Sequence, residues 1–182
     1  APVTRNSTIS VDRVLYTVPA RLIGRKLEVH LFDDRLECFL GPNAVVTLSR
    51  RRTDRPHRGH AIDYRHVIAT LRRKPQALRN LIYRDELFPS AAYARAWQAL
   101  DAGLPARQAC RVMVGLLELA ATGACEAALA ERLDAILDAG QLPDLVALRD
   151  ALAPRTPEVV DVTIPAPDLA AYNHLLTPEA QP

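Results

Sequence analysis

The chain has 182 residues, of which 49% are hydrophobic, and a formal net charge of +2 at pH 7. This length suits one domain of ordinary size or two small ones, and the apolar fraction is sufficient for a packed core. Because the sequence has no run of 18 or more apolar residues, we expect no transmembrane helix and no membrane partner.

The small net charge hides an asymmetry between the two halves of the chain. Residues 1–84 carry 17 Lys and Arg against 7 Asp and Glu, a net charge of +10. Residues 85–182 carry 6 Lys and Arg against 14 Asp and Glu, a net charge of −8. Such a division is typical of a nucleic-acid-facing part joined to a part with another role.

The chain begins with APVTRNSTIS, a polar segment that lacks an initiator Met and the apolar core of a signal peptide. We therefore expect residues 1–10 to be a linker from a missing upstream domain. The three cysteines, Cys38, Cys110 and Cys125, are scattered along the chain. An odd number without C-x-x-C spacing argues against a disulfide framework and a zinc site, and indicates a reducing compartment.

A β-hairpin is predicted over residues 26–40, KLEVHLFDDRLECFL, where apolar and polar residues alternate. Asp33-Asp34 supplies its two-residue turn. In this register His30 faces Glu37 on one side of the hairpin. The other side is expected to lie on a core and to carry three pairs: Leu31 with Leu36, Val29 with Cys38, and Leu27 with Leu40.

Further strands are predicted on both sides of this hairpin, at residues 14–18, 44–50 and 59–62. The turn Gly41-Pro42-Asn43 separates the hairpin from the strand AVVTLSR. Short strands with short connections predict a five-stranded, SH3-like antiparallel β-barrel over residues 11–64. Because helices follow it, the expected fold class is α+β.

Helical spacing begins after Tyr64, and Pro75 is expected to end the first helix. We assign residues 65–88 to connecting helices and residues 89–153 to a helical bundle that starts at an N-cap, Ser90. Helices are predicted at 106–122 and 125–139, with Gly123 and Gly140 at their ends, and after Pro143. Inside the first of these, Gly115 suggests close helix packing. Apolar stripes should form the core through residues that include Trp97, Cys110, Met113 and Leu117.

The last segment, residues 154–182, contains six of the 14 prolines. It is expected to be a Pro-rich tail with one short helix. The tail either packs on the helices or serves as a recognition segment for another molecule.

Several long phrases resemble the C-terminal region of IstA-type insertion-sequence transposases. They are DRVLYTVPARLIGRKLEVHLFDDRLECFLG, RGHAIDYRHVIATLRRKPQAL, NLIYRDELFPSAAYARAWQAL, ACRVMVGLLELA and GQLPDLVALRDALAP. The resemblance as a whole extends over residues 11 to about 176. Members of that family are DDE recombinases related to Mu transposase and retroviral integrases. The resemblance implies that this chain follows the helix-turn-helix region and the catalytic domain of a longer protein.

The resemblance also implies the partners: double-stranded DNA in terminal inverted repeats and possibly target DNA, other transposase subunits, and an AAA+ ATPase of the IstB type. A bacterial, cytoplasmic location at the nucleoid follows. A DDE site holds its metal ions with three carboxylates, and that triad belongs to the missing catalytic domain. We therefore expect no catalytic residue, no metal site and no cofactor here, with Mg²⁺ confined to the missing domain.

Cations of the first half are the candidate DNA contacts. The sequence LSRRRTDRPHRGH ends a predicted strand, and guanidinium groups on a loop suit phosphates and narrow minor grooves. The alternative is a solvated basic loop, or, for the cations that end the helix before Pro75, complementation of the helix dipole. The predicted DNA-binding residues are Arg21, Arg25, Lys26, Arg50, Arg51, Arg52, Arg55, His57, Arg58, His60, Arg65, Arg72, Arg73 and Lys74.

Two other functions stay open at this point. The chain could be a protein-interaction module for transposase oligomerisation or ATPase docking, because the acidic second half is unsuited to DNA and suited to protein contacts. A stand-alone enzyme would need a cluster of acid, base or nucleophilic groups, and the sequence shows none.

Overall fold

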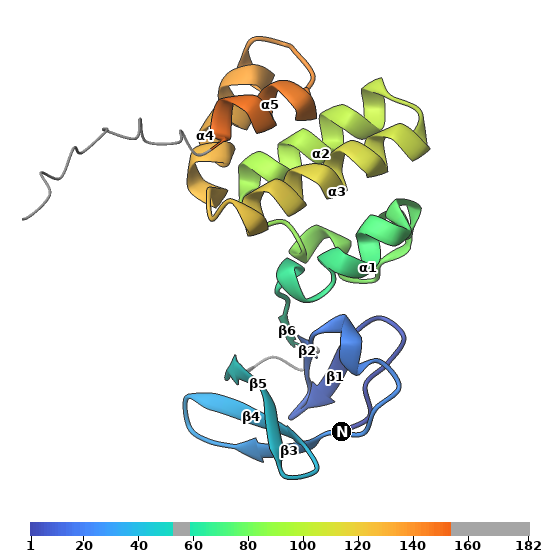
Figure 1. Ribbon diagram of the computed structural model, residues 1–182, viewed down its shortest axis with the longest axis vertical. Helices are drawn as coiled ribbons and strands as arrows, with labels where there is room; N and C mark the ends of the chain where they lie inside the picture. Colours follow the sequence, from blue (N-terminus) through green and yellow to red (C-terminus); the bar gives the residue numbers. More distant parts are fainter. Residues whose placement is uncertain (53–58, 154–182) are drawn as a thin grey trace, which may run out of the picture.

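A computed structural model describes residues 1–52 and 59–153 of the chain. Strands gather at one end of the molecule and helices at the other, and β6 (Gly59–Ala61) leads from one to the other (Figure 1). The expected α+β class is confirmed. The predicted tail, residues 154–182, and the loop residues 53–58 lie outside the described residues.

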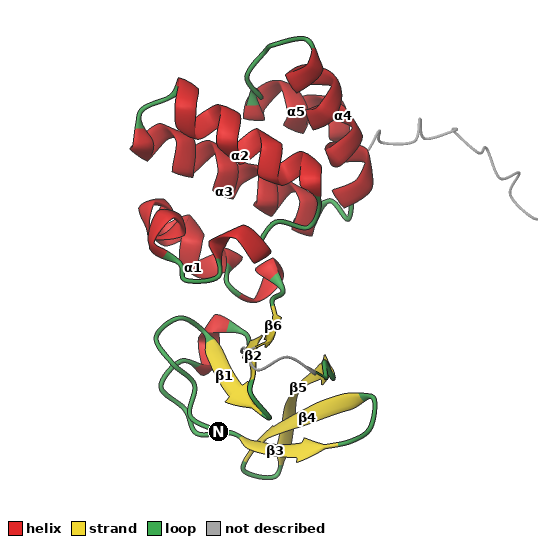
Figure 2. Ribbon diagram, turned by 180° about the vertical axis from the view of Figure 1, so that it is seen from behind, coloured by secondary structure: helices red, strands yellow, loops and turns green. Residues whose placement is uncertain are grey.

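The strands form two three-stranded sheets (Figure 2). One sheet has the order β1 (Thr8–Val11), β2 (Val14–Thr17), β6, and the other has the order β3 (Glu28–Leu31), β4 (Arg35–Leu40), β5 (Asn43–Ser49). Pairing of the described strands does not close these sheets into one barrel, so the barrel stays a prediction. The all-antiparallel expectation is wrong for β6, which pairs in parallel with β2. A parallel neighbour requires a long crossover, and the meander β3–β5 supplies it.

The predicted hairpin register is confirmed: His30 lies opposite Glu37, and Val29 lies opposite Cys38. Its core face extends less far than expected. Leu36 and Cys38 are fully buried, whereas Leu31 and Leu40, at the two ends of the hairpin, are 46% and 36% exposed. Alternation determines which face a residue takes, but the extent of the covering sheet determines how much of that face is buried.

Residues 1–10 belong to the sheets rather than to a linker. They contribute most of β1, and Val3 and Ile9 lie in the apolar core. The amide of Leu27 donates to the carbonyl of Ala1, which holds the first residues beside the start of β3. The polar residues of this segment suggested a linker, but Ser7 and Thr8 are buried as well. The expectation of a linker is therefore corrected by long-range pairing that no local pattern shows.

A run of short helical segments follows β6, with α1 ending before Pro75 as predicted, because proline cannot continue the hydrogen-bond ladder. Four longer helices pack above it (Figure 2). The bounds are η2 Tyr64–His66, α1 Ile68–Arg73, η3 Pro75–Asn80, η4 Arg84–Glu86, α2 Ala91–Gly103, α3 Ala106–Thr122, α4 Glu126–Asp138 and α5 Leu145–Leu152. A further 3₁₀ turn, η1, spans Ala20–Leu22 between β2 and β3.

The predicted apolar stripes form the helical core. Cys110, Met113 and Leu117 of α3 are completely buried, and Trp97 of α2 is 5% exposed. Gly115 confirms the expectation of close packing, because a Cβ atom there would lie 2.3 Å from Cδ2 of Leu145 at the start of α5. A side chain at this position would force Leu145 aside.

The helix ends agree with the sequence only in part. Ser90 is the N-cap residue of α2, but its side chain makes no capping hydrogen bond. Gly140 has a φ of +70°, and Gln141 donates to the carbonyl of Ile136, which closes α4 as predicted. Gly123 instead keeps a φ of −84°, and Ala124 takes the left-handed conformation with a φ of +46°. The expected left-handed glycine after α3 is therefore wrong by one residue.

Candidate nucleic-acid interface

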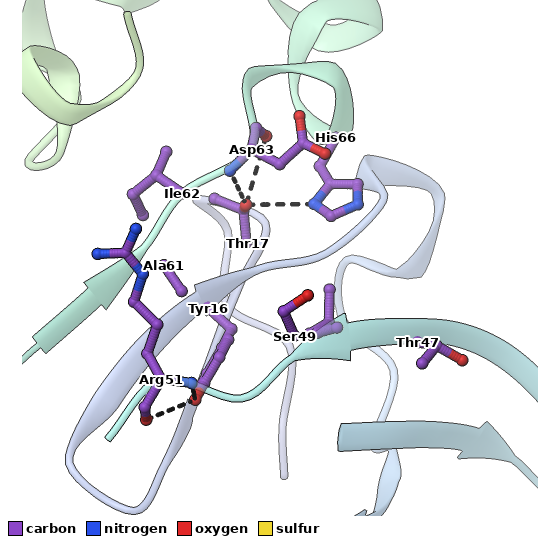
Figure 3. A pocket seen from close by; sticks show the side chains of 10 residues that line it. Tyr16, Thr17, Thr47, Ser49, Arg51, Ala61, Ile62, Asp63 and His66 are labelled. Carbon is purple, nitrogen blue, oxygen red and sulfur yellow. Dashed lines mark hydrogen bonds between the residues drawn. The ribbon is translucent and has the colours of Figure 1, made fainter. Parts of the chain in front are cut away.

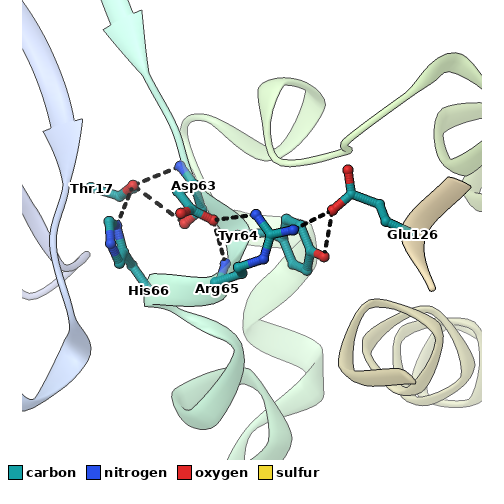
Figure 4. Close-up of polar contacts among 6 residues, drawn as sticks. All are labelled: Thr17, Asp63, Tyr64, Arg65, His66 and Glu126. Atoms are coloured by element: carbon teal, nitrogen blue, oxygen red, sulfur yellow. Dashed lines mark hydrogen bonds and ion pairs between the residues drawn. The ribbon is translucent and has the colours of Figure 1, made fainter. Parts of the chain in front are cut away.

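Polar side chains join the strands to the helices (Figure 4). The hydroxyl of Tyr64 and the guanidinium of Arg65 both donate to Oε2 of Glu126, at 2.9 and 2.7 Å. The hydroxyl of Tyr93 donates to the carbonyl oxygen of the same glutamate. Burial and the Glu126 carboxylate both raise the pKa of Tyr64, so this hydroxyl stays a donor. Glu126 thus fixes η2, directly after β6, against α2 and α4.

Two predicted DNA contacts, Arg65 and His60, lie near the junction of the strands and the helices and pair with acidic residues. Arg65 is exposed and lies over the ring of Tyr64, 5.0 Å from its centroid, besides its pair with Glu126. His60 of β6 contacts the carboxylate of Glu86 in η4. The structure therefore gives Arg65 and His60 roles between the strands and the helices, and both would have to leave an acidic partner to meet a phosphate.

Among the predicted DNA contacts that the structure describes, Arg50 is the most enclosed. Its guanidinium donates to the carbonyl of Phe32 at 2.9 Å and pairs with Asp12 at 3.2 Å, and its side chain is 17% exposed. These contacts fasten the end of β5 to the β3–β4 turn and to the β1–β2 turn. Nε of this guanidinium is buried without a hydrogen-bond partner among the described residues, and the other two nitrogens are held by Phe32 and Asp12. Arg50 is therefore poorly placed to meet a phosphate.

We expect Arg50→Ala to lower the free energy of unfolding by about 1–3 kcal/mol, the usual cost of losing partly buried hydrogen bonds to a charged group. The salt dependence of DNA binding should hardly change. Urea unfolding and a DNA titration of the same variant measure the two effects. Arg52→Ala removes an exposed arginine two residues later. It should leave the free energy of unfolding unchanged and weaken the salt dependence of DNA binding. A weaker salt dependence at unchanged stability in Arg50→Ala would show that Arg50 contacts DNA.

Arg51 and Arg52 follow β5, and both residues are exposed. The hydroxyl of Tyr16 accepts from the amide of Arg51 at 3.0 Å and donates to its carbonyl at 3.1 Å, which anchors the backbone and leaves the side chain exposed. Arg52 pairs with Asp33, but the two side chains are 64% and 98% exposed. Such an exposed pair is weak, so a phosphate can replace the carboxylate. The neighbouring candidates Arg55, His57 and Arg58 lie outside the described residues.

Three further predicted DNA contacts, Arg21, Arg25 and Lys26, are also exposed. Arg21 lies in η1 and donates to the carbonyl of Val45 in β5, at a long 3.5 Å. Arg25 and Lys26 follow directly before β3. The structure thus places Arg21 beside β5, the strand that ends at Ser49, two residues before Arg51.

A hollow of about 290 Å³ lies between the two sheets and η2 (Figure 3). Thr17 donates to the carbonyl of Asp63 and accepts from its amide, and Nδ1 of His66 lies 3.2 Å from the same hydroxyl. Burial lowers the pKa of His66, so its imidazole is neutral at pH 7. The hollow is therefore lined by hydrogen-bonding groups, and Arg51 at its wall is the charged group suited to an anion.

The remaining predicted contacts, Arg72, Arg73 and Lys74, lie at the end of α1, on the helical part. The structure brings them to a hollow that Arg107 and Arg111 of α3 also line. Sequence reasoning missed these two arginines because the second half of the chain is acidic on average. Their i, i+4 spacing, which places both on one face of a helix, was the available signal.

The donor sets needed for metal chemistry are not found in the described part of the chain. Within residues 1–52 and 59–153, no three His, Cys, Asp or Glu side chains lie together in a way that could hold a metal ion. The helices of these same ranges include none that is long and apolar enough to cross a membrane.

Known proteins give this geometry a context. Residues 1–58 match the family model described as the Mu transposase C-terminal domain. An uncharacterized protein of Sinorhizobium fredii, y4jA/y4nE/y4sE, is 46% identical over 175 residues, which is 96% of this chain and 35% of that protein. A transposase of Aminobacter aminovorans is 37% identical over 81 residues, 43% of this chain and 16% of that protein.

The chain therefore spans about a third or less of the length of these curated relatives. It is a homologue of a transposase, and its first 58 residues correspond to a domain outside the catalytic core. No solved structure matches the chain.

Proposed function

We propose that this chain is the non-catalytic C-terminal region of a DNA transposase, that it binds transposon-end or target DNA through backbone phosphates, and that it supports assembly of the transposase–DNA complex. The match of residues 1–58 to the Mu transposase C-terminal domain carries the proposal. The same residues hold most of the exposed cations of the strand part, including Arg21, Arg25, Arg51 and Arg52.

Charge and shape favour phosphate contact over base reading. Exposed arginines on short turns and strand ends can meet the backbone of a duplex, which positions a protein without specifying a sequence. The described strand part offers no helix long enough to fill a major groove. Sequence preference, where present, would then come from the shape and deformability of the DNA.

The finer assignment follows the resemblance. We propose an IstA-type transposase with an upstream DDE catalytic domain, further transposase subunits and an AAA+ ATPase of the IstB type as partners. Mg²⁺ would act in that upstream domain. The carboxylates of the described residues do not gather into a three-ligand site, so no step of DNA cleavage or joining is assigned to this chain.

A protein-interaction module is the second candidate, and one observation favours it. Leu31 and Phe32, at the β3–β4 turn, are 46% and 39% exposed, and the guanidinium of Arg35 lies 4.5 Å from the centroid of the Phe32 ring. Exposed apolar groups beside an arginine are typical of protein contacts. In this alternative the strand part meets another transposase subunit or the ATPase without binding DNA by itself.

Fluorescence anisotropy of labelled duplexes at several salt concentrations tests the proposal. If the strand part contacts four or five phosphates, it should by itself contribute about −4 to the slope of log Kobs against log[salt], because each neutralised phosphate contributes about −0.9. A transposon-end duplex and a random duplex of equal length should bind within an order of magnitude of each other. Absence of binding at low salt, together with a stable dimer or ATPase complex, would favour the interaction module.

A further inference from the structure

A basic groove crosses the helical part, away from the strand cations. It is a hollow of about 750 Å³ between the end of α1, η3 and the first half of α3. We call it the helical groove. Its polar lining consists of Arg72, Arg73, Lys74, Gln76, Asn80, Arg107 and Arg111.

Most of its cations have no acid to neutralise them. Arg72 pairs with Glu118 at 2.8 Å, and Arg149 approaches the same carboxylate at 3.6 Å. Among the residues that the structure describes, Arg73, Lys74, Arg107 and Arg111 make no ion pair. Like charges held side by side repel one another, so an anion in the groove relieves a cost that the folded protein otherwise carries.

The fold creates this concentration of charge by packing two segments that are distant in sequence. α1 ends at Arg73, before Pro75, and η3 then packs on α3 together with α1. Arg107 and Arg111 lie one turn apart on the outer face of α3, while Cys110 and Met113 occupy its buried face. The cations of two elements therefore share one hollow.

Helix stability does not account for Arg107. It is the second residue of α3, a helix of 17 residues with no acidic residue in its first turn. A cation at the positive end of a helix is unfavourable, whereas an anion is favoured there. This position costs the helix stability and adds attraction for an anionic ligand. By contrast, Arg72 and Arg73 at the end of α1 also complement a helix dipole.

We propose that the helical groove is a second binding site for the phosphate backbone of duplex DNA, separate from the strand cations. Arg107 and Arg111 are about 6 Å apart along the helix axis, and each strand of a duplex carries a charge every 3.4 Å or so of its axis. The two side chains can therefore meet different phosphates. The side-chain amides of Gln76 and Asn80 can donate to further phosphate oxygens.

An acidic protein segment is the competing ligand, and the lining disfavours it. The apolar part of the lining is Pro75 and Ala77. Protein interfaces depend on large anchors buried in pockets, and this groove has no deep apolar pocket for one. A polyanion needs only the charges and the hydrogen-bond donors that the groove provides.

The test compares two double variants of the full chain by DNA titration at several salt concentrations. Arg107→Ala with Arg111→Ala should reduce the magnitude of the salt slope by about 2, since two phosphate contacts are lost. Arg107→Lys with Arg111→Lys should keep the slope, because charge is retained. Thermal unfolding should be unchanged or slightly raised in the alanine variant, since a cation leaves the positive end of α3.

Arg132→Ala is the matched control, because Arg132 is exposed on α4 and does not line the groove. It should leave the salt slope unchanged. An unchanged slope in the alanine double variant would overturn the inference, and loss of binding to a labelled polyglutamate peptide in that variant would identify an acidic protein ligand instead.

A variant that lacks Arg21, Arg25, Arg51 and Arg52 separates this inference from the proposed function. If only that variant loses DNA binding, the strand part binds DNA and the helical groove does not. If only the Arg107 and Arg111 variant loses it, the groove binds DNA and the proposed role of the strand part fails. Loss in both supports two sites on one chain.

Discussion

Replacing Arg21, Arg25, Arg51 and Arg52 together with alanine is expected to reduce the magnitude of the DNA-binding salt slope by about 3 to 4. Each of these side chains is exposed, and a phosphate can replace the weak, exposed partners of Arg21 and Arg52. Each lost contact removes about 0.9 from the slope. At low salt, where such contacts supply most of the affinity, binding should weaken by several orders of magnitude. Fluorescence anisotropy between about 50 and 200 mM salt covers the range in which this effect is largest.

A variant with four other arginines replaced, Arg79, Arg84, Arg95 and Arg132, is the matched control. It removes the same charge from residues outside the strand part. Arg79 and Arg95 pair with acids, Arg95 with both Asp134 and Asp138. If DNA responds to the local surface, this control should change the slope by less than about 1. Equal losses in both variants would mean that net charge alone drives binding, and would contradict a specific phosphate-binding surface.

Alkaline pH is expected to destabilise the chain steeply, because its buried tyrosines resist ionisation. Burial raises the pKa of Tyr83 to about 12, and burial also raises the pKa values of Tyr64 and Tyr93. A tyrosine in the unfolded chain has a pKa of about 10. The stabilising contribution is therefore complete below pH 10 and is lost as pH rises through 12. Tyr83 alone should account for about 3 kcal/mol of this loss.

Urea unfolding at intervals from pH 9 to 11.5, with tyrosinate absorbance recorded in parallel, measures this loss. Tyr83→Phe is the control that isolates one residue. It should lower stability modestly at pH 9, because the Tyr83 hydroxyl donates to the carbonyl of Asn6 at 2.6 Å. It should also flatten the decline in stability between pH 10 and 11.5. A wild-type stability that stays constant up to pH 11.5 would contradict the buried positions of these hydroxyls.

The joint around Glu126 bears on both proposed DNA sites. Contacts of Tyr64, Arg65 and Tyr93 with this one residue hold η2, which follows β6, against α2 and α4. The contact of Tyr83 with Asn6 connects the helical part to the segment before β1. The strand cations and the helical groove are therefore held in a fixed relation to each other. Whether they bind one duplex or two, only a limited set of geometries is open to them. A fixed geometry of this kind suits the assembly role that we propose.

Local patterns determined a large part of the fold. The alternation around Asp33-Asp34 gave the hairpin register that places His30 opposite Glu37. Pro75 marked the end of α1, and the spacing of Met113 and Leu117 identified the buried face of α3. Each of these features depends on backbone geometry or side-chain periodicity within a few residues, so the sequence expresses it directly.

Contacts between distant segments decided the rest. Pairing of β6 with β2, the inclusion of residues 1–10 in a sheet, and the enclosure of Arg50 by Asp12 and Phe32 all join residues that are far apart in sequence. The same is true of the helical groove, where the acidic average of the second half concealed Arg107 and Arg111. The sequence alone determined which residues are charged and which face of each element they take. Only the packing of α1 and η3 on α3 decided which of those charges share a surface, because that depends on how the whole core is filled.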